Sequence, residues 1–96
     1  MYVHFEWDPR KRVANLEKHN TDFEIAIGIF EGPIHIRTDH RRDYGEDRFV
    51  ATGLLDGREM VVIYTLRGQV CRLISARKAR EDERAAYRAA FPAKPP

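Results

Sequence analysis

The sequence has little of what several classes of protein require. Cys71 is the only cysteine, which excludes an internal disulfide and any cysteine-rich zinc module and fits a reducing compartment. No apolar run approaches the roughly 20 residues that a membrane-spanning helix needs, so we expect no contact with a membrane. The first nine residues carry charges throughout and lack an apolar signal-peptide core, so we expect a cytoplasmic protein.

Signatures of common catalytic chemistries are also missing. The chain has no glycine-rich phosphate loop, no His-Glu-x-x-His pattern and no nucleophile elbow. Its four histidines do not have the spacing of metal ligands. They are His4, His19, His35 and His40. We therefore expect neither a metal ion nor another cofactor.

The composition is that of a small globular protein. Hydrophobic residues make up 43% and charged residues 33% of 96 residues, which predicts one domain over residues 1–96. The net charge of +2, from 17 basic and 15 acidic residues, is a weak indication of nucleic-acid binding. Most of the basic residues are arginines, the side chain best suited to bidentate contacts with phosphate.

The N-terminal third predicts a strand and two helices. Residues 3–7 alternate like a strand, and Asp8-Pro9 then predicts the start of a helix that runs to His19, with Asn20 at its C-cap. Val13 and Leu16 should face inward. Residues 23–30 fit both strand and helix periods, and the capping box at residues 21–24 with the stop at Gly32-Pro33 favours a helix.

The rest of the chain predicts a sheet followed by a helix. Strands are expected at 34–38, 48–55, 58–66 and 69–75, with a polar loop at 39–47 and a helix from Ala76 to about Phe91. Asp56-Gly57 and Arg67-Gly68 are hairpin turns, too short for parallel crossovers. The prediction is an α+β fold with helices packed on a small antiparallel meander.

The two hairpins determine which side chains share a face of the sheet. One face should be almost wholly apolar and pack on the N-terminal helices; it holds Phe49, Ala51, Leu55, Met60, Val62, Tyr64, Cys71 and Leu73. The other should hold Arg48, Val50, Thr52, Val61, Ile63, Thr65, Arg72 and Ile74. The apolar residues of this second face need cover that one C-terminal helix does not fully provide.

Arginines on strands are the main candidates for a functional site. Arg48 and Arg72 share a face, and Ser75 and Arg77 follow at the junction of strand and helix. Such a cluster can hold a scissile phosphate and neutralise the charge that develops when a 2′-oxygen attacks it. The alternative is that these arginines pair internally with Glu46, Glu59 or Glu83.

Candidates for acid–base chemistry lie around this cluster. They are His19 beside Lys18, Glu46 in the long loop, and Glu83, which shares a helical face with Tyr87. An ordinary salt bridge with a core tyrosine would explain Glu83 and Tyr87 equally well. Arg80 should lie on the outer face of the last helix.

The ordered combination of these motifs resembles the BrnT family. Phe5-Glu6-Trp7-Asp8, Asn15, Lys18-His19 and Asp22-Phe23 look like the opening of that family. Asp39 with Tyr44-Gly45-Glu46-x-Arg48 and Gly53 resembles its middle. Arg72-x-Ile74-Ser75-Ala76-Arg77-x-Ala79, with Glu83 and Tyr87, resembles its end. Asn20 departs from the glycine expected after Lys-His but tolerates the same left-handed conformation.

The resemblance implies a RelE-like fold and a ribonuclease toxin that blocks translation by cleaving mRNA without a metal. It implies a BrnA-like ribbon-helix-helix antitoxin as partner, with operator DNA bound only by the complex of the two. The resulting prediction assigns catalysis to Arg72, Arg48, Arg77, His19, Glu83 and Tyr87, and RNA binding to Lys18, Ser75 and Glu46. The other hypotheses are a non-catalytic nucleic-acid or antitoxin-binding module, and an interaction domain whose arginines close internal ion pairs.

Overall fold

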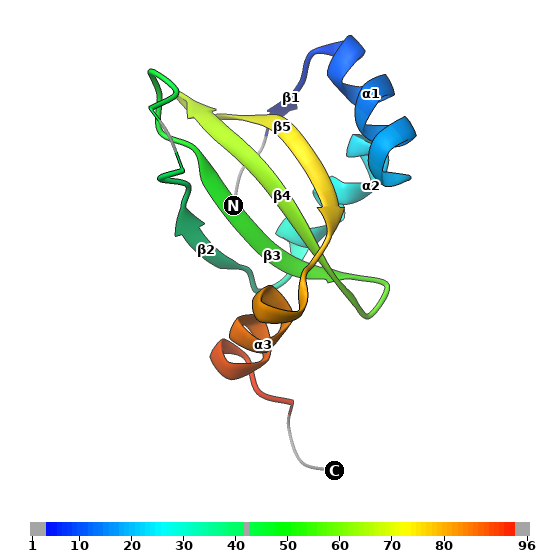
Figure 1. Ribbon diagram of the computed structural model, residues 1–96, viewed down its shortest axis with the longest axis vertical. Coiled ribbons are helices and arrows are strands. Elements are labelled where there is room, and N and C mark those ends of the chain that lie inside the picture. The colour runs from blue at the N-terminus through cyan, green and yellow to red at the C-terminus, as the bar shows by residue number, and fades with distance from the viewer. Residues whose placement is uncertain (1–3, 42, 94–96) are drawn as a thin grey trace.

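The computed structural model describes residues 4–41 and 43–93 as a five-stranded sheet with helices on its two faces (Figure 1). The strand order is β1-β5-β4-β3-β2. The elements in chain order are β1 (His4–Glu6), α1 (Pro9–His19), α2 (Phe23–Ala26), the 3₁₀ helix η1 (Ile27–Glu31), β2 (His35–Thr38), β3 (Phe49–Leu55), β4 (Arg58–Arg67), β5 (Val70–Lys78) and α3 (Glu81–Ala90).

The last four strands form the predicted meander, but the first strand runs the other way. β2, β3, β4 and β5 pair antiparallel with their neighbours, which confirms that prediction. β1 pairs parallel with β5, so the sheet is mixed and the expectation of a purely antiparallel sheet is wrong. The reason is that tight turns set the direction only of the strands they join, and most of the chain separates β1 from β5.

The predicted apolar face is confirmed. Six of its residues are buried in the main hydrophobic core with Phe23, Ala26, Ile29 and Phe30 of α2 and η1, and the other two, Phe49 and Leu55, are partly buried and pack against it. Gly53 allows this close packing of η1 on β3, because a Cβ atom there would lie 2.8 Å from Cβ of Ile29. Asp22 caps α2 by accepting from the backbone N–H of Glu24, one residue later than the predicted capping box places the cap.

The opposite face is covered by the chain itself. Val50, Val61 and Ile63 are buried and pack with Ala79, while α3 contacts β2 and β3. The prediction that this face lacks cover is therefore wrong for these three residues. Part of the cover comes from Ala79, which lies in the segment between β5 and α3 and not in a helix.

Helix α1 has the predicted ends but a different buried face. Asp8 caps its start and Asn20 ends it in the left-handed conformation, at φ 52°. Val13 and Leu16 are 58% and 44% exposed, so the prediction that they point inward is wrong. The buried residue of the helix is the polar Asn15, because its amide bonds to the backbone of β5 replace apolar packing.

Strand β5 is longer than predicted and contains an irregularity. It continues to Lys78, and α3 begins at Glu81 rather than at Ala76. The turn before it is centred on Gly68 and Gln69, one residue later than predicted, because Arg67 pairs with Val70. Leu73 pairs with Tyr64 while Ser75 pairs with Ile63, so the extra residue, Ile74, makes a β-bulge.

The bulge reverses the alternation of side chains along β5. Without it, Ser75 and Arg77 would fall on the apolar face; with it, they lie opposite Ile63 and Val61 on the other face. This places the polar end of β5 on the same side of the sheet as Arg48.

Candidate functional site

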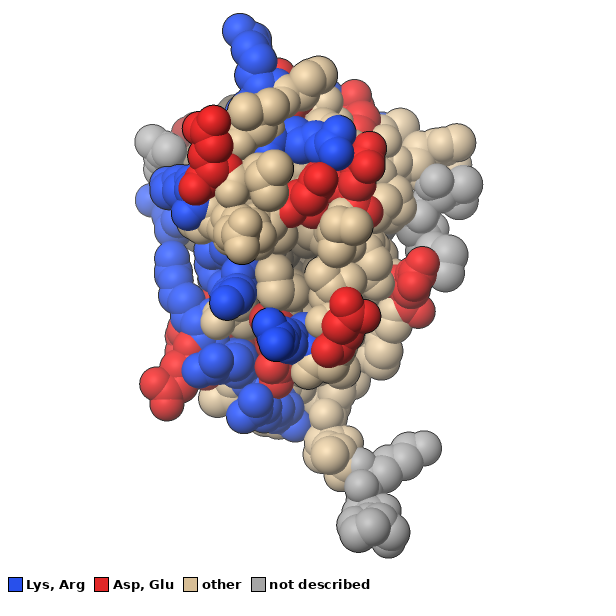
Figure 2. Space-filling model, turned by 90° about the vertical axis from the view of Figure 1, so that its right-hand side faces the viewer, with Lys and Arg blue, Asp and Glu red and all other residues tan. Residues whose placement is uncertain are grey.

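A shallow pocket of about 250 Å³ lies on the α3 side of the sheet and is lined mainly by cations. Its lining combines the end of α1, the loop before β3, the end of β5 and the residue before α3. The lining residues are Lys18, His19, Arg41, Arg48, Ile63, Ile74, Ser75, Arg77 and Arg80; none of them is acidic. We call this the basic pocket. Figure 2 shows Lys and Arg side chains gathered along one side of the molecule.

Helix α1 delivers Lys18 and His19 to the pocket in its last turn. Asn15, one turn earlier, fixes the position of this helix end. Its amide nitrogen donates to the carbonyl oxygens of Thr21 and Ala76 at 2.9 and 2.8 Å. Its amide oxygen accepts from the N–H of Ala76 and from Ser75 Oγ at 3.1 and 3.3 Å. Three of the four bonds go to Ser75 and Ala76 next to the bulge, so α1 and β5 are tied together where they line the pocket.

Arg77 is held by a buried carboxylate. Its two terminal nitrogens donate to the two oxygens of Glu83 at 2.7 and 3.0 Å, and Glu83 also accepts from the Arg80 N–H at 2.8 Å and from Arg37 at 3.3 Å. Burial opposes ionisation of Glu83, but the bonds from Arg77 and Arg80 outweigh it and lower its pKa to about 2. Glu83 is therefore a carboxylate at neutral pH, and it fixes the guanidinium of Arg77.

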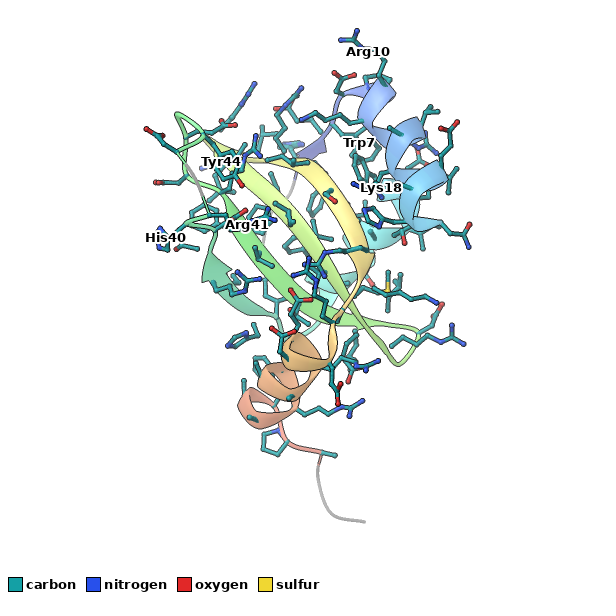
Figure 3. All side chains as sticks on the ribbon, in the orientation of Figure 1. Trp7, Arg10, Lys18, His40, Arg41 and Tyr44 are labelled. Atoms are coloured by element: carbon teal, nitrogen blue, oxygen red, sulfur yellow. The ribbon has the colours of Figure 1, made fainter. Side chains whose placement is uncertain are left out.

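Arg41 is positioned in the same way by Asp39. It donates twice to this carboxylate at 2.9 Å, and Tyr44 Oη donates to it at 3.3 Å. The bonds from Arg41 lower the pKa of Asp39 to about 2. Figure 3 shows Lys18 from α1, and Arg41 with Tyr44 from the loop, on either side of β4 and β5.

Arg48 has no carboxylate partner among the residues that the structure describes. Its guanidinium carbon lies 3.8 Å from the centroid of the Tyr44 ring. Its Nε atom is buried and has no hydrogen-bond partner within the described part of the chain. A buried N–H without an acceptor is costly and therefore uncommon, which sets Arg48 apart from Arg41 and Arg77 in the same pocket.

His19 is neutral at neutral pH. Partial burial lowers its pKa below the ordinary value of 6.5, and the nearby charges of Lys18 and Arg77 lower it further. A neutral imidazole has one nitrogen free to accept a proton. The pocket thus combines a proton acceptor with several permanent cations.

Five of the nine residues predicted from the sequence line the basic pocket. They are Arg48, Arg77, His19, Lys18 and Ser75. Glu83 lies behind it, bonded to Arg77. The other three lie elsewhere. Arg72 Nη1 donates to Glu6 of β1 at 2.8 Å, Tyr87 Oη donates to the Pro33 carbonyl at 3.0 Å, and Glu46 lies 3.8 Å from Arg67.

The sequence prediction omitted three residues that build the pocket. Arg41 and Arg80 line it, so the expectation that Arg80 faces away on α3 is wrong. The cause is the late start of α3, which makes Arg80 the residue before the helix instead of part of its surface. Asn15 belongs to the motif that resembles the family, and its spacing before Lys18-His19 is the signal in the sequence that points to its role.

The described residues contain no group of three or more His, Cys, Asp or Glu side chains that could hold a metal ion. Within the same residues, no helix is long and apolar enough to cross a membrane.

The fold and the pocket define a class: a small α+β protein whose sheet carries a cationic pocket with no acidic lining residue. The sequence model of the family described as "Ribonuclease toxin, BrnT, of type II toxin-antitoxin system" matches residues 7–83. The chain therefore belongs to this family and is a ribonuclease toxin, whose substrate is RNA and whose partner is an antitoxin. No curated protein matches the chain.

Proposed function

We propose that the basic pocket is the catalytic site of an endoribonuclease that needs no metal ion. The observation that carries this proposal is the neutral imidazole of His19 within a group of cations that has no carboxylate among its lining residues. RNA contains its own nucleophile, the 2′-hydroxyl, so cleavage requires a base, charge stabilisation and correct orientation.

His19 acts as the base in this proposal. It accepts the proton of the 2′-hydroxyl while the 2′-oxygen forms a bond to phosphorus. The bond from phosphorus to the 5′-oxygen breaks, and that oxygen takes a proton from solvent, which reaches the open pocket. The products are a 2′,3′-cyclic phosphate and a 5′-hydroxyl, and His19 returns its proton to solvent.

Arg48 and Arg77 stabilise the charge on the phosphate oxygens. Arg48 lines the pocket and stacks on Tyr44, and Arg77 is already oriented by Glu83. Lys18, Arg41 and Arg80 bind RNA, and Ser75 lies among them. Glu83 acts as a positioning residue, and Arg72, Tyr87 and Glu46 stabilise the fold outside the pocket.

The partner in this proposal is a BrnA-like ribbon-helix-helix antitoxin. It neutralises the toxin by covering the basic pocket, and the complex binds operator DNA through the antitoxin. Cleavage of mRNA by the free toxin would inhibit translation. The alternative, a module that binds RNA without cleaving it, is supported by the same cations and differs only in its products.

The test is cleavage of an RNA oligonucleotide by the purified protein in excess EDTA. We expect fragments that end in a 2′,3′-cyclic phosphate, and no cleavage at a position where 2′-deoxyribose replaces ribose, because the nucleophile is then missing. Binding without cleavage would favour the non-catalytic module. Cleavage that stops in EDTA and returns with added metal would contradict the proposal.

A further inference from the structure

A second hollow of about 430 Å³ adjoins the basic pocket and shares one wall with it. Its lining residues are Glu17, Lys18, His19, Asn20, Arg77, Lys78 and Arg80. The residues common to both are Lys18, His19, Arg77 and Arg80. We call this second space the flanking hollow. Lys78 lines the flanking hollow and not the basic pocket, whereas Arg41 and Arg48 line only the basic pocket.

The flanking hollow is also cationic. Among the residues that the structure describes, Lys18, Lys78 and Arg80 have no carboxylate partner within ion-pair distance, since the ion pairs involve other side chains. Glu17 is the one acidic lining residue and is exposed. Arg77 is paired with Glu83, so Lys18, Lys78 and Arg80 are the cations of this hollow that have no carboxylate partner in the described part of the chain.

We propose that the flanking hollow binds the phosphate next to the scissile one. This inference rests on the proposed function and extends it to the path of the RNA. Consecutive phosphates of one RNA strand are joined by the covalent backbone. When one phosphate lies in the basic pocket, the next phosphate therefore lies on an adjacent surface of the protein. The shared wall of Lys18, His19, Arg77 and Arg80 places the catalytic base between two phosphate sites, and Lys78 belongs to the second site alone.

A second consequence is a minimum substrate. A dinucleotide has a single internucleotide phosphate and leaves the flanking hollow empty. A trinucleotide with the additional phosphate on the correct side fills both sites. Lys78 then makes binding depend on the length of the RNA and not on its base sequence, because phosphate contacts carry no sequence information.

The experiment combines Lys78→Ala with RNA that lacks the charge of one linkage. The probe is a short RNA with 2′-deoxyribose at the scissile position, so that binding is measured without cleavage. Neutral methylphosphonate replaces either the linkage on the 5′ side or the linkage on the 3′ side of the scissile one. Arg10→Ala is the control because it removes the same charge from a side chain that is 93% exposed at the far end of α1 (Figure 3).

We expect Lys78→Ala to weaken binding of the all-phosphate RNA several-fold and to reduce the slope of log K against log salt concentration by about 0.7, the value for one contact to single-stranded nucleic acid. One of the two methylphosphonates should weaken wild-type binding equally and abolish the effect of Lys78→Ala. With the other methylphosphonate, the effect should remain. Arg10→Ala should change neither the affinity nor the coupling.

Three results would overturn the proposal: no effect of Lys78→Ala, an equal effect with both methylphosphonates, or no RNA binding by the wild type. An acidic protein segment as the true occupant of the hollow would give the first of these. Failure of the proposed function would look different. Lys78→Ala would still be coupled to one linkage in the binding experiment, but all-ribose RNA would remain uncleaved after incubation with the protein.

Discussion

Arg48 and Arg72 have opposite surroundings, although both lie on the α3 side of the sheet. Arg48 stacks on Tyr44 and lines the basic pocket. Arg72 is paired with Glu6 across the parallel strands β1 and β5. Arg72 lies outside the basic pocket, whereas Arg48 lines it, so the two should respond differently to substitution.

Arg48→Ala should lower the rate of RNA cleavage by roughly 10²–10³-fold, the usual effect of removing one group that stabilises the charge of a transition state. Arg48→Lys should restore only part of it, since an ammonium group cannot make the bidentate contact of a guanidinium. Arg72→Ala is the matched control and should leave cleavage nearly unchanged, with at most about 1 kcal/mol lost from the free energy of unfolding. An inactive, stable Arg72→Ala protein would return the catalytic role to Arg72.

The rate of cleavage should depend on the ionisation of His19. Because its pKa lies below 6.5, the imidazole is neutral at neutral pH, and kcat/KM should fall about tenfold per pH unit once the pH drops below that pKa. The measurement is kcat/KM across the acidic range for wild type and His19→Ala. The variant should be slow and lose this acidic limb, while His40→Ala, at an exposed residue outside the pocket, should keep it. An unchanged limb in His19→Ala would exclude His19 as the base.

Individual arginines are where prediction from the sequence was weakest. Residue types and order were enough to select Arg48, Arg77, Lys18 and His19, all of which line the pocket. They could not show that Glu6 neutralises Arg72, because that pair exists only through the parallel contact of residues far apart in the chain. The relative direction of two strands that no turn connects is determined by the tertiary structure and not by a local sequence signal.

At the scale of elements, the joint between α1 and β5 determines the shape of the pocket. Asn15 uses both donors and its oxygen in four bonds, three of them to backbone groups. Only an amide side chain both donates and accepts in this way. The helix end that carries Lys18 and His19 is therefore located by one side chain.

Asn15→Asp should damage catalysis more than stability accounts for. An aspartate keeps the accepting oxygen but replaces the NH₂ group, which donates to two carbonyl oxygens, with a second acceptor. This oxygen would face the two carbonyl oxygens, so the end of α1 should separate from β5. We expect a loss of kcat well above any change in KM for RNA, since the cations remain, together with a lower thermal midpoint. Ser75→Ala removes only the 3.3 Å bond to Asn15 and serves as the milder variant. Asn15→Asp with wild-type kcat would contradict this role.

The ends of elements were predictable where a local signal exists. Asp8-Pro9 and Asn20 delimit α1 as expected, and Asp56 and Gly57 adopt the positive φ angles, 51° and 78°, of the predicted turn. The bulge at Ile74 and the extension of β5 to Lys78 had no such signal. Both arise from pairing with β4, which continues past the point where the sequence of β5 looks like a strand.

For the whole molecule, two buried carboxylates make the free energy of unfolding depend on pH in the acidic range. Glu83 and Asp39 both have pKa values of about 2 in the folded protein, below the ordinary 4.5 and 3.8. Each contributes stability that is fully present above its ordinary pKa and is lost as the pH falls toward about 2. The chain should therefore lose much of its free energy of unfolding across this acidic window.

Thermal midpoints measured from neutral pH down to about 2 should show this loss. Glu83→Gln should be less stable at neutral pH, because removing one partner of a buried pair costs roughly 3–5 kcal/mol. Its stability should also depend less steeply on pH. Glu24→Gln is the control, since Glu24 is exposed. An acid transition of equal size in Glu83→Gln and wild type would show that this carboxylate does not control acid stability.

The contact between β1 and β5 has a consequence for the order in which the molecule forms during its synthesis. Residues 4–6 pair with residues 70–72, so this edge of the sheet closes only after most of the chain exists. The basic pocket also forms only after β5 has been synthesised, because its lining residues Ser75, Arg77 and Arg80 follow residues 70–72 in the chain. A nascent chain that ends before β5 holds Lys18, His19, Arg41 and Arg48 without Ser75, Arg77 and Arg80. The ribosome can therefore finish making this toxin before the toxin is able to act.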